Sequence, residues 1–208
     1  MSVLSNMSES SPTGRVPLRG EAHGDEALAA IYARATAAAG RVPALYQALA
    51  NAPAQLRGWT DLAWALRAEA RSDRALRELA ILRCAYLVQS SYVWCSHVRL
   101  ADAAGVSERQ VAAITDWRAH HASYSPAVQA VLTVTDELAG PGAVSDEAWR
   151  SAAQHLDPGA LVEVVLTISW YLHVARVVDT LGVPPEEYHA RVTPLPPRAL
   201  DGPSHQEQ

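Results

Sequence analysis

Apolar residues recur with the 3.6-residue period of amphipathic helices along most of the chain, and β-branched residues do not alternate with polar ones over any extended stretch. This pattern predicts an all-α fold. Residues that cap or break helices divide the pattern into about ten segments. We expect helices over residues 25–39, 43–50, 53–70, 73–88, 90–104, 108–117, 125–138, 145–156, 159–181 and 184–190.

Residues with capping preferences set several of these helix ends. Ser72 is the expected N-cap of the helix that begins at Asp73, and the Asp side chain favours the positive end of the helix dipole. Ser107 and Gln110 have the spacing of a capping box, and Gly105 has the place of a C-terminal glycine. Only short turns are then left between the helices, as in a helical bundle.

A chain of 208 residues that is 49% hydrophobic is long enough for one ordinary domain with a core, and two full domains would be crowded. We expect a single helical bundle over residues 23–192. Residues 1–22 are rich in Ser, Gly and Pro and lack the apolar segment of a signal peptide, whereas residues 193–208 are Pro-rich and polar. Both ends are therefore expected to be disordered.

The charge balance is mildly acidic, with 22 acidic and 17 basic residues and a net charge of −5. Because no basic stripe is available to neutralise phosphates, nucleic acid is not an expected partner. Every basic residue is Arg, and the lack of Lys excludes Schiff-base and P-loop chemistry. The sequence also lacks the His, Cys and carboxylate spacings typical of metal sites, so we expect neither a metal nor a cofactor.

Two features indicate a cytoplasmic protein without a membrane span. The chain has two cysteines, which is too few for a disulfide framework and typical of a reducing compartment. The most apolar stretch, residues 160–178, is interrupted by Glu163, His173 and Arg176. These polar side chains favour a buried core helix over a helix in a membrane.

Two ionisable side chains fall on apolar helix faces. Glu78 shares a face with Ile81 and Leu82, and His97 lies on the apolar side of the next predicted helix. A buried carboxylate must be paired, hydrogen-bonded or protonated, so Glu78 is either half of a structural ion pair or part of a site. His97 is likewise either a hydrogen-bonded core histidine or a functional one. If the two helices pack antiparallel, the carboxylate can orient the imidazole for general acid/base catalysis.

Other polar groups on the same two segments leave alternatives open. Cys95 is close to a helix start, which is expected to lower the pKa of its thiol, but its side chain diverges from that of His97. It is either a small buried hydrophobe or a nucleophile. In the long apolar helix, Glu163 is expected to be a structural contact, and His173 is either structural or part of a pocket.

The sequence RELAILRCAYL at residues 77–87, followed by SSYVWCSHVRLA at 90–101, resembles the carboxymuconolactone decarboxylase and alkylhydroperoxidase D-like superfamily. Residues 40–53 and 161–184 extend this resemblance, which covers residues 25–188 in all. It implies an all-α fold that assembles as a homo-oligomer, commonly a trimer or hexamer. The active site in such proteins lies between helices and near subunit contacts.

The peroxidase branch of this superfamily carries a Glu, then Cys-x-x-Cys twelve positions later, then a His four positions after the second Cys. Matched to this chain, the Glu is Glu78, the His is His97, and the two cysteine positions are Ser90 and Val93. Thiol peroxidase turnover requires a nucleophilic thiolate and a resolving partner, and Cys95 is out of register with both positions. A dithiol hydroperoxide reductase is therefore disfavoured.

What remains is the proton-transfer part of the site, as in the decarboxylase branch. We expect a cofactor-independent lyase or isomerase that uses His97 as general acid/base and Glu78 to orient it. The expected reaction is a decarboxylation, isomerisation, elimination or cyclisation of a small carbonyl- or lactone-bearing molecule, in a biosynthetic or catabolic pathway. The further site residues expected are Ser90, Tyr92 and Cys95 for hydrogen bonds, and Trp94, Trp170, Tyr171 and His173 as pocket walls.

Two other functions remain open at this point. One is a peroxide-handling oxidoreductase that uses Cys95 as its nucleophile. The other is a non-catalytic helical oligomer that binds a small ligand.

Overall fold

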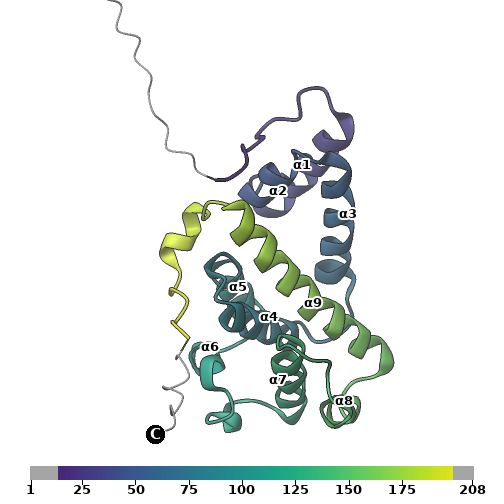
Figure 1. Cartoon of the computed structure of the whole chain (residues 1–208), viewed down its shortest axis with the longest axis vertical. Helices are drawn as coiled ribbons and strands as arrows, with labels where there is room; N and C mark the ends of the chain where they lie inside the picture. The colour runs from purple at the N-terminus through teal and green to yellow at the C-terminus, as the bar shows by residue number, and fades with distance from the viewer. Residues whose placement is uncertain (1–13, 199–208) are drawn as a thin grey trace, which may run out of the picture. The chain divides into compact units, whose positions relative to one another are not determined.

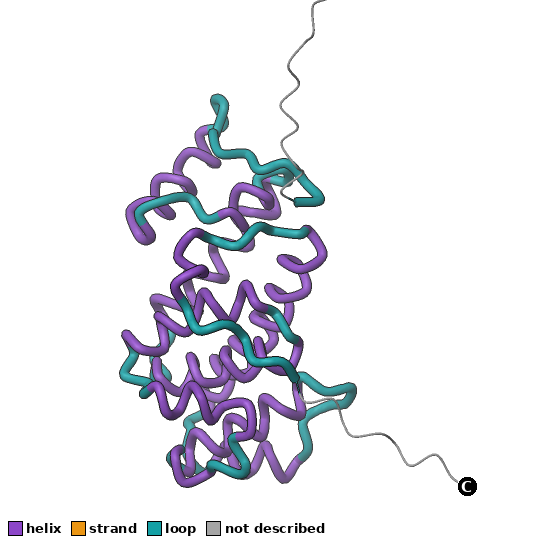
Figure 2. Tube along the Cα trace, turned by 90° about the vertical axis from the view of Figure 1, so that its left-hand side faces the viewer, coloured by secondary structure: helices purple, strands orange, loops and turns teal. Residues whose placement is uncertain are grey.

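The computed structural model describes residues 14–198. Within this range the chain is entirely helix, turn and loop (Figure 1, Figure 2), which confirms the all-α prediction. The α-helices are α1 (Glu26–Ala39), α2 (Ala44–Leu49), α3 (Pro53–Trp64), α4 (Arg74–Val88), α5 (Ser91–Ala103), α6 (Glu108–Ala113), α7 (Pro126–Leu138), α8 (Asp146–Ala153) and α9 (Pro158–Leu181). Shorter helical segments are η1 (Ala65–Glu69), η2 (Ile114–Asp116), η3 (His121–Ser123) and η4 (Glu187–Arg191).

Most helix ends lie within a few residues of their predicted places. The capping box of Ser107 and Gln110 is present at the start of α6. The N-cap of α4 is Asp73 and not Ser72, because the Asp73 carboxylate accepts from the Leu76 N–H at 2.8 Å. Residues 53–70 are not one α-helix, since the chain changes from α-helix to π-helix at η1.

The described chain forms two compact units, of which the first comprises residues 14–61 and 178–186. Its core contains Leu28, Ile31 and Tyr32 of α1 and Leu45 of α2. Glu186 supplies a cap for α2, because its Oε1 accepts from the Ala44 N–H at 2.8 Å while Oε2 pairs with Arg41.

The second unit comprises residues 62–177 and 187–198. In it α4 packs against both α5 and α7, and α7 packs against α8. One apolar cluster joins α4, α7, α8 and the first half of α9, with Leu76, Val131, Ala148 and Ile168 among its buried members. The helix α4 is thus central to this unit, and most of its side chains from 76 to 86 are buried.

Among the described residues, α9 is one helix that is long and apolar enough to cross a membrane by length and composition. Its residues Leu161, Val164 and Ile168 belong to the core of the second unit, whereas Val162 and Leu166 are exposed.

The described parts of the two predicted disordered ends make defined contacts. The Arg19 N–H donates to the Gln47 carbonyl at 3.0 Å, and the Trp94 indole donates to the Thr193 carbonyl at 2.9 Å. The rest of those ends, residues 1–13 and 199–208, lies outside the described residues, and the predicted domain boundaries stay a prediction.

Candidate active site

The side chain of Glu78 is presented by the most buried stretch of α4. Its neighbours Leu79 and Leu82 are 1% and 0% exposed, and Glu78 itself is 0% exposed. A carboxylate so placed requires partners on both oxygens, because burying a bare charge costs several kcal/mol. Both partners are found in the second unit.

The first partner is His97, which α5 directs toward α4. Gln89 ends α4 in the left-handed conformation, at φ 56°, so that α5 begins directly afterwards at Ser91. The two helices pack together, and Nδ1 of His97 lies 2.7 Å from Oε2 of Glu78. His97 is 6% exposed, so this contact is sheltered from water. The pairing predicted between the two side chains is thus present in the structure.

The second partner is Arg74, one turn before Glu78 on α4. Its Nε and Nη2 lie 2.7 Å and 2.5 Å from Oε1 of Glu78. Its Nη1 donates to the Arg67 carbonyl of η1 at 3.1 Å, so the π-helical segment helps to hold the guanidinium in place. Arg74 is not among the predicted site residues, although the i, i+4 spacing of an Arg and a Glu is a signal for this pair.

These partners decide the protonation state of Glu78. Burial by itself raises the pKa of the carboxyl group, but the charges and hydrogen bonds of His97 and Arg74 outweigh burial and hold the pKa below its usual value. Glu78 is therefore an anion that can only accept a hydrogen bond, and Nδ1 of His97 must be the donor. In the neutral imidazole this leaves Nε2 without a proton, as the nitrogen able to take one.

Tyr171 of α9, which we predicted to be a pocket wall, contacts this pair. Its ring meets the His97 ring edge to face, with centroids 4.5 Å apart. Tyr171 is 6% exposed, so this ring contact is buried, and its role as a pocket wall stays a prediction.

Other predicted site residues on α5 contact the C-terminal segment of the second unit. The Tyr92 ring packs edge to face on His189, with centroids 5.0 Å apart, and Trp94 donates to Thr193. Ser90 is fully buried as the N-cap residue of α5. Their predicted roles in hydrogen bonding and in the pocket stay predictions.

Trp170 and His173 pair with each other, at a ring-centroid distance of 5.7 Å. Trp170 is half-buried and His173 is exposed. Glu163, which we expected to be structural, accepts from the N–H groups of Arg71 and Ser72 at 2.8–3.0 Å and so supports the chain that leads into α4.

The expected effect of the helix start on Cys95 is wrong, because burial instead raises the pKa of this thiol. Cys95 is 8% exposed and Cys84 is fully buried, and burial also raises the pKa of Cys84. Val93, in the place of the second redox cysteine, is buried as well. These surroundings favour two inert thiols over a peroxide-reactive thiolate.

Comparison with known proteins relates part of this chain to a known protein family. Residues 53–137 match the model of the Carboxymuconolactone decarboxylase family, a range that includes Glu78 and His97. No curated protein matches the chain significantly in sequence.

Solved structures with the same fold share little sequence with this chain. An uncharacterized peroxidase-related protein from Ralstonia eutropha JMP134, with an alkylhydroperoxidase AhpD core, is 16% identical, with a TM-score of 0.75 over 86% of this chain and 95% of that one. The debrominase Bmp8, in a variant bound to 2,3,4-tribromopyrrole, is 14% identical, with a TM-score of 0.73 over 85% and 94%. A peroxidase-related protein from Silicibacter sp. TM1040 is 13% identical, with a TM-score of 0.72 over 88% and 97%. Residues 53–137 thus match the Carboxymuconolactone decarboxylase family model, within an all-α fold shared with alkylhydroperoxidase D-like proteins.

Proposed function

We propose that this protein is a cofactor-independent acid/base enzyme that acts on a small carbonyl- or lactone-bearing organic molecule. The observation that supports this most is the buried contact of 2.7 Å between Nδ1 of His97 and Oε2 of Glu78. A carboxylate held as an anion fixes both the orientation of the imidazole and the nitrogen that exchanges protons. The family region that contains both residues supports the same class of function.

In the proposed mechanism, Nε2 of His97 removes a proton from a carbon next to the substrate carbonyl. The imidazolium that forms is stabilised by Glu78, whose own charge is held by Arg74. His97 then returns the proton to the same or a neighbouring atom, so the catalyst ends as it began. General acid/base catalysis of this kind contributes a factor of about 10²–10⁴ in rate, and positioning of the substrate must supply the rest.

Isomerisation, elimination and cyclisation through an enolate begin with this proton removal, and His97 later gives the proton back to carbon or to the leaving group. In a decarboxylation the departure of CO₂ itself leaves the enolate, which takes a proton from His97 in its imidazolium form, and solvent then supplies a new proton to His97. The similarity to a debrominase solved with 2,3,4-tribromopyrrole supports a small organic molecule as substrate. The buried thiols argue against Cys95 as the nucleophile of a peroxide-handling enzyme.

Proton exchange with solvent tests the proposal without knowledge of the full reaction. A panel of small keto acids and lactones is incubated with the protein in D₂O, and deuterium incorporation next to the carbonyl is followed by ¹H NMR. We expect catalysed exchange for at least one structural class, with a loss of about 10²-fold or more in His97→Gln and in Glu78→Gln. Glu147→Gln, which changes an exposed carboxylate on α8, is the matched control and should exchange at the wild-type rate.

Equal exchange in the wild type and in His97→Gln would contradict the assignment of His97. Saturable binding of panel members without any exchange would instead support a ligand-binding protein, provided that both variants bind with unchanged affinity.

We also propose that the enzyme is cytoplasmic and forms a homo-oligomer, a trimer or hexamer. Val162 and Leu166, one turn apart on α9, are 56% and 44% exposed. Exposed apolar side chains on one helix face favour association between copies. Light scattering of the wild type should give a multiple of the monomer mass, and Leu166→Asp should lower it.

A further inference from the structure

A groove of about 450 Å³ opens on the second unit between the η2–η3 segment, α7 and α8. Polar and cationic side chains contribute much of its lining, among them Arg118, His121, Gln129 and His155. Its size lies within the range of sites for small organic molecules. Neither Glu78 nor His97 belongs to its lining, so the groove is a different site from the one described above.

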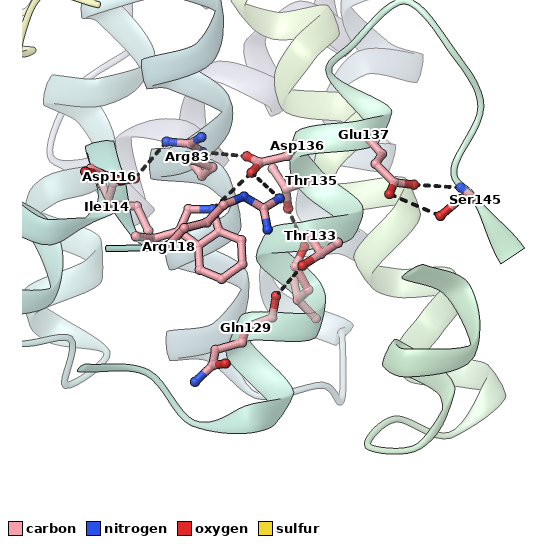
Figure 3. Close-up of polar contacts among 12 residues, drawn as sticks. Arg83, Ile114, Asp116, Arg118, Gln129, Thr133, Thr135, Asp136, Glu137 and Ser145 are labelled. Carbon is pink, nitrogen blue, oxygen red and sulfur yellow. Dashed lines mark hydrogen bonds and ion pairs between the residues drawn. The ribbon is translucent and has the colours of Figure 1, made fainter. Parts of the chain in front are cut away.

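One carboxylate beside this groove is shared by two guanidinium groups (Figure 3). Oδ1 of Asp136 accepts from Arg83 Nε at 2.6 Å, and Oδ2 accepts from Arg118 Nη2 and from the Trp117 indole, both at 3.0 Å. Arg83 is also held by the carbonyls of Ile114 and Thr115, at 2.9 Å and 2.8 Å. The cluster of Arg83, Arg118 and Asp136 therefore has a net charge of +1.

Arg118 carries this excess charge to the groove. Asp136 accepts a hydrogen bond from one nitrogen of Arg118, and the Arg118 guanidinium lies 4.4 Å from the centroid of the Trp117 ring. These two contacts orient the Arg118 side chain, although it is 58% exposed. A guanidinium has five N–H donors, and the contact with Asp136 uses one of them. The other donors form the planar fork that matches a carboxylate.

The imidazoles add further polar groups to the lining. Nδ1 of His121 donates a hydrogen bond to the Arg118 carbonyl at 3.3 Å. Nε2 is then the second hydrogen-bonding atom of the His121 ring. His155, just after α8, contributes another imidazole. Gln129 uses its amide nitrogen on the carbonyls of His121 and Tyr124, so its side chain is fixed by this part of the chain.

We propose that this groove binds a small organic carboxylate, with Arg118 as its principal anchor. The exposed guanidinium of Arg118 attracts an anion, its planar fork suits the two oxygens of a carboxylate, and the volume leaves room for a ring next to the charged group. This binding does not depend on the proton-transfer function proposed for Glu78 and His97.

Benzoate is a suitable probe, because it combines one carboxylate with a small ring. The ¹⁵N signals of the Trp117 indole and of the Arg118 guanidinium are followed while benzoate is raised into the millimolar range at constant ionic strength. We expect saturable shifts of both signals in the full-length protein. Arg118→Gln should weaken the affinity, read from the Trp117 signal, on the order of 10-fold or more, because it removes a charged hydrogen bond. Arg109→Gln, at an exposed arginine on α6, should leave the affinity unchanged.

Two further probes make the proposal specific. Benzamide keeps the ring without the charge and should not produce the shifts, whereas inorganic phosphate should bind more weakly than benzoate. Equal binding of benzoate to wild type and Arg118→Gln, or equal shifts from phosphate and benzoate, would overturn the proposal. The double variant Glu78→Gln/His97→Gln should bind benzoate as the wild type does, which separates this result from any failure of the catalytic proposal.

Discussion

Arg74 and Glu78 lie one turn apart on α4, and two nitrogens of Arg74 contact the same carboxylate oxygen, Oε1. Among the described residues, the other oxygen, Oε2, contacts His97. One oxygen of the Glu78 carboxylate therefore binds Arg74, which stabilises its negative charge, and the other binds His97 and orients the imidazole. This arrangement explains how a carboxylate with no exposed surface stays ionised.

Removal of Arg74 should make Glu78 easier to protonate. In Arg74→Gln the guanidinium that lowers the pKa of Glu78 is lost, so the pKa should rise relative to wild type. The ¹³C signal of the Glu78 carboxyl group, followed as the pH changes, measures this directly. Stability should fall by about 1–2 kcal/mol, less than for a fully buried pair because Arg74 is 37% exposed. An unchanged Glu78 titration would show that Arg74 is a bystander, and Arg109→Gln controls for a general change in charge.

The same pKa shift makes the fold sensitive to acid. The pKa of Glu78 is lower in the folded protein than its ordinary value of 4.5 in an unfolded chain, so the unfolded state binds the proton more tightly. The contribution of ionised Glu78 to the stability of the fold is present above pH 4.5. This contribution should be lost as the pH falls from 4.5 through the pKa of Glu78 in the folded protein. Urea unfolding across this range should show a smaller acid dependence in Glu78→Gln than in Glu147→Gln. Identical pH dependence in these two variants would mean that Glu78 is not held as an anion.

Both cysteines should react slowly in the folded protein. Cys84 is 0% and Cys95 8% exposed, and burial raises the pKa of both thiols, so little thiolate is available near neutral pH. Ellman's reagent should label neither at a rate near that of a free cysteine, and both after denaturation. In the variant Cys84→Ala only Cys95 can react, so this variant shows which cysteine causes any fast phase of labelling. Rapid native labelling at Cys95, with peroxide consumption, would instead support the oxidoreductase alternative.

The sequence predicts the fold class well because helix caps are local features. The capping box at Ser107 is present in the structure, and Ser125 and Ser145, where two predicted helices begin, are N-caps whose side chains accept from the backbone N–H three residues later. The π-helical segment η1 could not be predicted in this way. Its carbonyl at Arg67 bonds a side chain seven residues later, and such a contact has no local signature.

The pairing of Glu78 and His97 could be predicted because both fall on apolar faces of consecutive helices joined by a short turn. The surroundings of Cys95 could not. Proximity to a helix start suggested a lower pKa, but burial, which depends on segments distant in the sequence, dominates and raises it. For the same reason the groove beside Arg118 has no signature in the sequence, since its lining comes from separate helices.

The protonation pattern of His97 tests the central claim most directly, because it reports which ring nitrogen is free to accept a proton. Long-range ¹H–¹⁵N correlation spectra of the histidine rings, recorded at a pH where His97 is neutral, distinguish the two tautomers. We predict that the His97 ring carries its proton on Nδ1 in the wild type, and that Glu78→Ala shows a larger share of the Nε2–H form. A wild-type His97 with its proton on Nε2, or a pattern that does not respond to the loss of Glu78, would contradict it.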